Sequence, residues 1–242
     1  LTTMYGATET QGITMVHWEL ERVGMVGLPL PGQTLKLVPT GAKMEVRVKG
    51  PMVMKGYLNL PEKNKEVFDE EGFYCLGDAA RFSDPQHPEK GLVFDGRVTE
   101  DFKLNSGTWV SVGTLRPDIV AACAPLVADA VVCGQDKAYV GALLWPSPAA
   151  MKAAMEAAGG DGAKAVGELT MQVAQKLAAF NATQSGSSRK VGRFKILTTP
   201  PSLDAGEITD KGYVNQRVTL DRRKAQVDAL FTEPPGPGVI VV

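Results

Sequence analysis

Apolar and polar residues alternate over short stretches in the first part of the chain. Met44–Lys49 is the clearest case, because Glu45, Arg47 and Lys49 each follow an apolar neighbour. This spacing predicts a half-buried strand with the three charged side chains on a solvated face. Gly and Pro residues typical of turns separate such stretches. We therefore expect a small, distorted β-barrel or sheet here.

The spacing changes to alternating helices and strands in the second part of the chain. Two nearly continuous apolar runs, Val127–Cys133 and Tyr139–Trp145, predict buried strands. An Ala-rich run, Ala163–Ala182, predicts a long helix with one apolar face. The residues of that face are Val166, Leu169, Val173, Leu177 and Phe180. The fold class expected from both parts is α+β, with two domains.

The two patterns meet at Asp95–Lys103. An apolar strand, Leu92–Phe94, runs into a turn at Asp95 and Gly96, and a new strand carrying Lys103 follows a short acidic bend. We predict a joint between the two domains at this point.

Charge and residue counts exclude several classes of protein. The chain has 26 basic and 27 acidic residues, so its charge balance shows no electrostatic footprint for nucleic acid. The apolar runs are too short to span a bilayer, and no signal peptide is recognisable, so we expect no membrane span. The three cysteines are odd in number, which favours free thiols in a reducing, cytoplasmic environment. With only two histidines, a His-based metal site or catalytic triad is poorly supported.

The first candidate for chemistry is Tyr5–Thr10. Gly6 allows a turn or a close backbone approach. Thr8 supplies a hydroxyl, and Glu9 supplies an oxygen ligand of the kind that Mg²⁺ takes beside a phosphate. The alternative is a capping sequence in which Thr8 or Thr10 opens a helix. The residues alone leave both interpretations open.

The second candidate is Asp78, which follows Gly77 at the end of a predicted strand. A carboxylate in this place can accept hydrogen bonds from the hydroxyl groups of a ligand. It can equally cap its own backbone in a turn.

The order of these motifs resembles that of the adenylate-forming superfamily. The chain contains Tyr5–Glu9, then Gly77-Asp78, then Asp95–Arg97, then a strand with Lys103 and a Ser106-Gly107 turn, then a late lysine loop. That superfamily includes acyl- and aryl-CoA ligases. The stretches that look most like bacterial feruloyl-CoA synthetases are Glu70–Tyr74, Gly91–Arg97, Glu100–Leu104, Ser106–Val110 and Asp204–Tyr213.

The resemblance implies a domain organisation. Residues 1–97 would be the C-terminal part of the large AMP-binding domain, 98–100 a hinge, and 101–232 a small, mobile α+β lid. Residues 233–242, rich in Pro and Gly, would form a flexible tail. The chain starts with Leu1, and the family's phosphate-binding loop lies upstream of its Tyr-Gly-x-Thr-Glu motif. We therefore expect a longer enzyme whose N-terminal part is missing here, and a chain that is inactive alone.

The resemblance also implies a reaction and its ligands. A small carboxylic acid, ferulate or a similar hydroxycinnamate, would be activated with ATP and Mg²⁺ as an acyl-adenylate, and then transferred to coenzyme A with release of AMP. Thr8 would contact the AMP phosphate, Glu9 would bind Mg²⁺, and Asp78 would accept from the ribose hydroxyls. The implied nucleotide-binding residues are Tyr5, Gly6, Thr8, Asp78 and Arg97.

Two further sets of residues follow from the resemblance. The hinge would be Val98, Thr99 and Glu100, and the coenzyme A channel would be lined by Lys103, Ser106 and Gly107. Lys211 is the candidate catalytic lysine, since adenylation builds negative charge that a cation stabilises. A surface lysine in the first turn of a helix is the alternative for Lys211.

The sequence departs from the superfamily pattern in three places. Thr99 stands where the pivot is commonly Asp or Lys, and the turn before Gly107 has an extra residue. Glu207 follows Gly206 where a lysine is usual, and Lys211 comes four residues later. Two other functions therefore stay open: a ligase for another aryl or fatty acid, and a non-catalytic binding protein that kept the lid.

Overall fold

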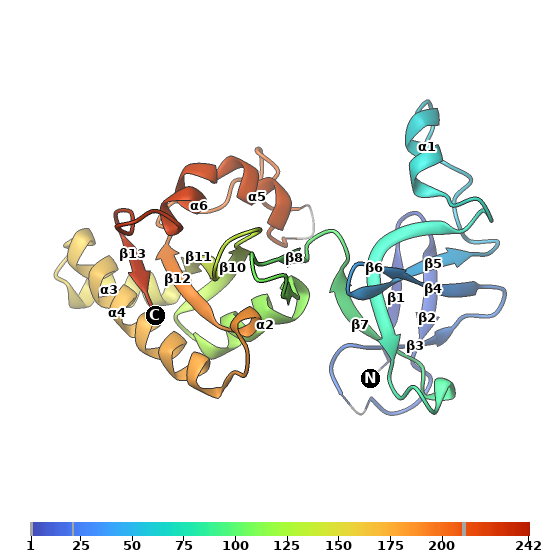
Figure 1. Ribbon diagram of the computed structural model, residues 1–242, viewed down its shortest axis with the longest axis horizontal. Helices are drawn as coiled ribbons and strands as arrows, with labels where there is room; N and C mark the ends of the chain where they lie inside the picture. Colours follow the sequence, from blue (N-terminus) through green and yellow to red (C-terminus); the bar gives the residue numbers. More distant parts are fainter. Residues whose placement is uncertain (1, 21, 210–211) are drawn as a thin grey trace. The chain divides into compact units, whose positions relative to one another are not determined.

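The computed structural model describes residues 2–20, 22–209 and 212–242 (Figure 1). The chain divides into two compact units, Leu1–Thr99 and Glu100–Val242. The first is built mainly of strands and the second mixes helices with strands, so the α+β class predicted from the two spacings is confirmed.

The first unit is organised around a seven-stranded antiparallel sheet in the order β1-β2-β3-β7-β6-β5-β4. Within the described residues β1 and β4 are free edges, so the sheet stays open and does not close into a barrel. The elements are β1 (Met4–Ala7), β2 (Gln11–Met15), β3 (Met25–Pro29), β4 (Thr34–Thr40), β5 (Lys43–Lys49), α1 (Pro61–Val67), β6 (Tyr74–Phe82), η1 (Pro88–Lys90) and β7 (Leu92–Arg97).

Strand β5 shows how the alternating pattern is used. Val46 and Val48 are fully buried, as predicted. The opposite face is more ordered than a solvated surface, because Arg47 donates to Glu45 (3.0 Å) and to Asp69 (3.1 Å). Glu45 is only 7% exposed. The expectation of a fully solvated face is therefore wrong for Glu45, whose carboxylate pairs with Arg47 of the same strand, and Asp69 from a neighbouring turn holds Arg47 in turn.

The second unit contains a four-stranded sheet in the order β10-β11-β12-β13 and a small two-stranded sheet, β8-β9. In the larger sheet only the β11–β12 pair is parallel. The elements are β8 (Phe102–Lys103), β9 (Trp109–Val110), α2 (Val112–Ala122), β10 (Val127–Cys133), β11 (Val140–Pro146), α3 (Pro148–Ala157), α4 (Gly162–Thr183), η2 (Ser187–Arg189), β12 (Val191–Ile196), α5 (Gln216–Arg222), α6 (Lys224–Leu230) and β13 (Val239–Val241).

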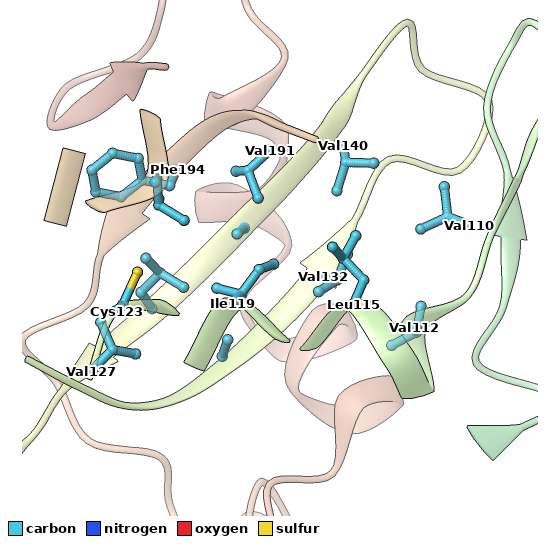
Figure 2. Close-up of a cluster of buried hydrophobic side chains, with 14 of the residues drawn as sticks. Val110, Val112, Leu115, Ile119, Cys123, Val127, Val132, Val140, Val191 and Phe194 are labelled. Atoms are coloured by element: carbon cyan, nitrogen blue, oxygen red, sulfur yellow. The ribbon is translucent and has the colours of Figure 1, made fainter. Parts of the chain in front are cut away.

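Both faces of this sheet are covered, which explains the continuous apolar runs. On one face Val132 lies in a buried cluster with Ile119 of α2 (Figure 2), and Val173 of α4 belongs to the same cluster. On the other face Val131 packs in a separate cluster with Leu230 of α6. Because successive side chains of a strand point to opposite faces, a strand covered on both sides is apolar throughout. The long helix is confirmed as α4, and its predicted face is buried at Leu169, Val173 and Leu177.

The C-terminal residues differ from the flexible tail that was expected. Val239–Val241 form strand β13, which pairs antiparallel with β12, and Phe194 lies opposite Ile240. The prediction relied on the Pro- and Gly-rich composition of the preceding residues. It overlooked a short run of β-branched residues, which pairs with the edge of the sheet at β12. No helix in the described ranges combines the length and apolar character needed to cross a membrane.

Candidate functional site

The Tyr5–Thr10 motif lies on the hairpin between β1 and β2. The Thr10 amide donates to the Ala7 carbonyl (3.1 Å), and the Thr10 hydroxyl accepts from the Ala7 amide (3.0 Å). Gly6 is required here, because a Cβ atom would lie 1.8 Å from the Gln11 carbonyl oxygen. The motif therefore forms a hairpin turn, and the alternative that it opens a helix is wrong. Thr8 is exposed on the turn and Glu9 is partly exposed.

Tyr5, Asp78 and Arg97 meet on the sheet although they are far apart in sequence. The Tyr5 hydroxyl donates to Asp78 Oδ2 (2.9 Å) across 73 residues of chain. Asp78 on β6 lies opposite Arg97 on β7 in the strand register, and Arg97 Nε is 3.4 Å from Asp78 Oδ1. The sheet thus brings together three of the five residues proposed to bind a nucleotide.

The Asp78 carboxyl is buried, but only one of its two oxygen atoms accepts a hydrogen bond from the described residues. It is 9% exposed, and its Oδ1 atom accepts no hydrogen bond from the described residues. Burial raises the pKa of Asp78, while the Arg97 charge and the Tyr5 hydrogen bond oppose that shift. A buried acceptor without a donor is costly. Two hydroxyl donors of a ribose would satisfy such an atom, so the residues fit the group that the resemblance implies.

Glu9 is held by a tyrosine that the sequence did not single out. The Tyr57 hydroxyl donates to Glu9 Oε1 (2.8 Å) and lies 3.3 Å from the Tyr74 hydroxyl. Burial, the hydrogen bond with Tyr57 and the nearby Glu9 charge together raise the pKa of Tyr74, so its hydroxyl stays protonated. Tyr57 is in an irregular loop, and irregular loops lack the periodicity from which a side-chain direction can be predicted.

No group of three or more His, Cys, Asp or Glu side chains among the described residues could hold a metal ion by itself. Mg²⁺ is commonly held by one or two carboxylates together with phosphate oxygens and water. Glu9 has the right donor chemistry for such a ligand.

The residues expected at the coenzyme A channel lie on the β8–β9 hairpin in the second unit, Lys103 on β8 and Ser106 and Gly107 in the turn. Lys103 Nζ is 4.9 Å from the centre of the Trp109 ring, and the Ser106 hydroxyl donates to Thr108 Oγ1 (3.0 Å). Gly107 has φ of 81°, and a Cβ atom there would meet nothing within 4 Å. The turn thus needs a glycine for its backbone and leaves open space beside it.

The expected hinge residues lie where the two units divide. The Val98 amide donates to the Gly77 carbonyl (3.0 Å), Thr99 ends the first unit and Glu100 begins the second.

Glu207 has a structural partner. Arg223 donates to Glu207 through Nε (2.8 Å) and Nη2 (3.0 Å), and the Ser202 amide donates to the same carboxylate (2.8 Å). The Arg223 hydrogen bond lowers the pKa of Glu207 against the opposing effect of burial. Glu207 therefore ties its loop to Arg223 at the junction of α5 and α6. Lys211, the candidate catalytic lysine, lies outside the described residues.

Comparison with known proteins places this geometry in a family. Residues 110–234, just over half of the chain, match the AMP-binding enzyme C-terminal domain. A probable acyl-activating enzyme 16 of Arabidopsis thaliana is 27% identical over 94% of this chain and 34% of its own length. The long-chain-fatty-acid–CoA ligase FadD15 of Mycobacterium bovis is 26% identical over 95% of this chain and 38% of its own.

A solved structure shows the same fold. The adenylation domain of a carboxylic acid reductase from Segniliparus rugosus, in complex with AMP and a co-purified carboxylic acid, has a TM-score of 0.72. It is 23% identical, and the match covers 96% of this chain and 35% of that one.

The chain spans about a third of the length of the curated relatives named above. The family match itself covers most of the second unit, from β9 to the residues just after α6. The chain therefore belongs to the family of AMP-binding enzyme C-terminal domains.

Proposed function

We propose that this chain supplies the C-terminal part of an ATP-dependent acid–thiol ligase. The observation that carries the proposal is the Tyr5–Asp78–Arg97 cluster with its unfilled buried oxygen, Asp78 Oδ1. The matches to adenylate-forming relatives along nearly the whole chain support it. Since these relatives are about three times as long, the proposed activity belongs to a longer protein that contains this chain.

The proposed reaction has two steps. A carboxylate oxygen of the acid attacks the α-phosphorus of ATP, the bond to the bridging oxygen of the β-phosphate breaks, and pyrophosphate leaves. The sulfur of coenzyme A then attacks the acyl carbonyl, AMP leaves, and the thiol proton passes to water. Bound Mg²⁺ would neutralise phosphate charge during the first step.

The residues of this chain have separate parts in the proposal. Asp78 and Arg97 bind the ribose, and Tyr5 lies beside the adenine and fixes the Asp78 carboxylate. Thr8 would contact the α-phosphate, Glu9 would hold Mg²⁺, and Lys211 would stabilise the charge that develops at the α-phosphate. Val98–Glu100 form the hinge, and Lys103, Ser106 and Gly107 line the path of the thiol.

Two classes of acid are candidates. The segments that resemble feruloyl-CoA synthetases favour a hydroxycinnamate. The names of curated relatives favour a long-chain fatty acid, because FadD15 and the chloroplastic ligase AEE15 are described as long-chain-fatty-acid ligases.

A pyrophosphate-release assay with ATP and Mg²⁺ tests the proposal. The acids are ferulate and palmitate, and the proteins are this chain and one extended upstream to the length of its relatives. We expect release only from the extended protein, and thioester formation when coenzyme A is added. A Lys211→Ala variant of the extended protein should lose about a hundredfold or more in adenylation rate.

The opposite results are equally informative. Release by the isolated chain would contradict the proposed dependence on an upstream part. No release from the extended protein with either acid would favour another acid substrate or the non-catalytic binding function. Glu207 no longer supports that alternative, because its carboxylate has a structural partner in Arg223.

A further inference from the structure

The loop between β5 and α1 holds Glu9 at two points. The Met54 amide donates to the Glu9 carbonyl (2.7 Å), and the Tyr57 hydroxyl donates to Glu9 Oε1 (2.8 Å). The side-chain contact joins residues 48 positions apart. Both the backbone and the carboxylate of Glu9 are therefore fixed by one distant segment.

A second hydroxyl supports the first. The Tyr57 hydroxyl has a single proton, which it donates in the hydrogen bond to Glu9, because an ionised carboxylate can only accept. The Tyr74 hydroxyl, 3.3 Å away, must then be the donor to the Tyr57 oxygen. Tyr74 is 7% exposed and sits in a buried cluster with Ile13 and Val48. The chain of hydroxyls thus starts in the core and ends at the Glu9 carboxylate.

Helix α1 fixes the backbone of Tyr57. Asn64 on α1 accepts from the Tyr57 amide (2.7 Å) and donates to the Tyr57 carbonyl (3.0 Å). A Cβ atom at Gly56 would lie 2.9 Å from the Asn64 side chain, so a glycine at this position lets the loop lie close to Asn64. Helix α1 fully buries none of its own residues, and within the helix Val67 packs partly against the cluster of Ile13, Val48 and Tyr74.

Only one carboxylate oxygen of Glu9 is used in this way. Among the residues that the structure describes, Oε2 accepts no hydrogen bond, and the side chain is partly exposed. A carboxylate with one oxygen fixed by a protein donor and the other open is arranged like a metal ligand supported by an outer-shell hydrogen bond.

We propose that Tyr57 is a positioning residue that orients the Glu9 carboxylate for a divalent cation, with Asn64 and Tyr74 holding Tyr57 in place. This inference rests on the proposed function, since it takes Glu9 as the Mg²⁺ ligand. Outer-shell partners of this kind are worth about 10- to 100-fold in metal affinity.

The test measures metal binding apart from turnover. Mn²⁺ is titrated into the upstream-extended protein with an ATP analogue whose α–β bridge cannot be cleaved, and free Mn²⁺ is followed by electron paramagnetic resonance. We expect Tyr57→Phe to weaken Mn²⁺ binding about 10- to 100-fold. Tyr139→Phe is the matched control, because it removes a tyrosine hydroxyl that donates to the Leu230 carbonyl in the other unit. It should bind Mn²⁺ as the unmodified protein does.

A double variant shows whether Tyr57 acts through Glu9. If it does, Glu9→Gln with Tyr57→Phe will bind Mn²⁺ no more weakly than Glu9→Gln alone. Additive losses would overturn the inference. Asn64→Ala keeps the Tyr57 hydroxyl but removes its anchor, so it should weaken binding as well. It serves as the second variant if Tyr57→Phe does not fold.

The inference and the proposed function fail in different ways. Unchanged Mn²⁺ binding in Tyr57→Phe, with loss in Glu9→Gln, would overturn the role of Tyr57 and leave the proposed function standing. Unchanged binding in Glu9→Gln would overturn the metal role of Glu9 and with it this inference, whereas the proposed ligase activity is tested separately by pyrophosphate release.

Discussion

The Asp78 carboxylate has one oxygen held by a hydrogen bond and one without a donor. The Tyr5 hydroxyl satisfies Oδ2, whereas Oδ1 is buried and has only the Arg97 side chain nearby, at 3.4 Å. Arg97 itself is 60% exposed, so its charge is screened by solvent and compensates the buried oxygen weakly. Such an atom is suited to a ligand that brings its own donors.

Asp78→Asn in the upstream-extended protein tests this point. The amide keeps the shape of the carboxylate but loses its charge and one acceptor, and hydrogen bonds to charged groups contribute about 1.5–3 kcal/mol. We expect kcat/KM for ATP in pyrophosphate release to fall about 10- to 100-fold. Asp84→Asn is the control, because Asp84 lies in the β6–β7 loop, where it pairs with Lys90. An Asp78→Asn protein with the ATP kinetics of the control would exclude Asp78 from the nucleotide site.

At the scale of elements, the loop after β12 is held by a buried ion pair. Glu207 and Arg223 have side chains that are 3% and 11% exposed, and the carboxylate also accepts from the Ser202 amide. Removing one partner of a buried pair leaves the other charge without compensation. The pair thus fixes the loop that leads toward the candidate lysine, and it does so without any catalytic role for Glu207.

Glu207→Gln should lower the free energy of unfolding of the second unit by about 3 kcal/mol. Urea unfolding read by hydrogen exchange of the β11 amides reports this unit alone. Asp228→Asn is the control, since the Lys224–Asp228 pair on α6 is exposed and its loss should cost about 0.5 kcal/mol or less. Equal losses of unfolding free energy in the two variants would show that the buried pair contributes no more stability than the exposed pair.

The same pair predicts a pH dependence. The folded-state pKa of Glu207 is lowered, and the value in an unfolded chain is about 4.3. The stabilisation is therefore complete above that pH and is lost as the pH falls through the folded-state value. We expect the urea concentration at the unfolding midpoint, followed at the β11 amides of the unmodified chain, to decrease when the pH is below about 4. The midpoint of Glu207→Gln should change less over the same range, and parallel curves would contradict the assignment.

At the scale of the whole molecule, the chain is two units joined at Thr99 and Glu100. Each unit has its own buried clusters, so either can keep its fold while the joint changes conformation. The proposed two-step reaction requires such a change, because one set of residues serves adenylation and another serves the thiol.

Thr99→Pro should separate the two steps. Proline fixes its own φ near −65° and restricts the preceding residue, so the joint loses conformations. In the extended protein we expect thioester formation to slow about tenfold or more, with pyrophosphate release largely kept. Thr99→Ala, which leaves the backbone free, should affect neither step. Equal slowing of both steps by proline would argue against a hinge at Thr99.

Much of the architecture was predictable from the sequence by itself. Residue spacing predicted the strand-rich first part, the buried strands β10 and β11, and the apolar face of α4. The order of short motifs pointed to the right superfamily, and Gly6 was identified as a place of close backbone approach. These features are local, because burial on one face of a strand or helix repeats every two or 3.6 residues and leaves a periodic trace.

Only the tertiary structure decided which side chains meet. The sheet register brings Tyr5 and Asp78 together across 73 residues, and an irregular loop carries Tyr57 to Glu9 across 48. Glu207, a departure from the family pattern in the sequence, proved to be the buried partner of Arg223. The C-terminal strand β13 formed because β12 offered it an open edge. Such pairings depend on register, loop paths and free edges, which no periodic pattern within a segment can encode.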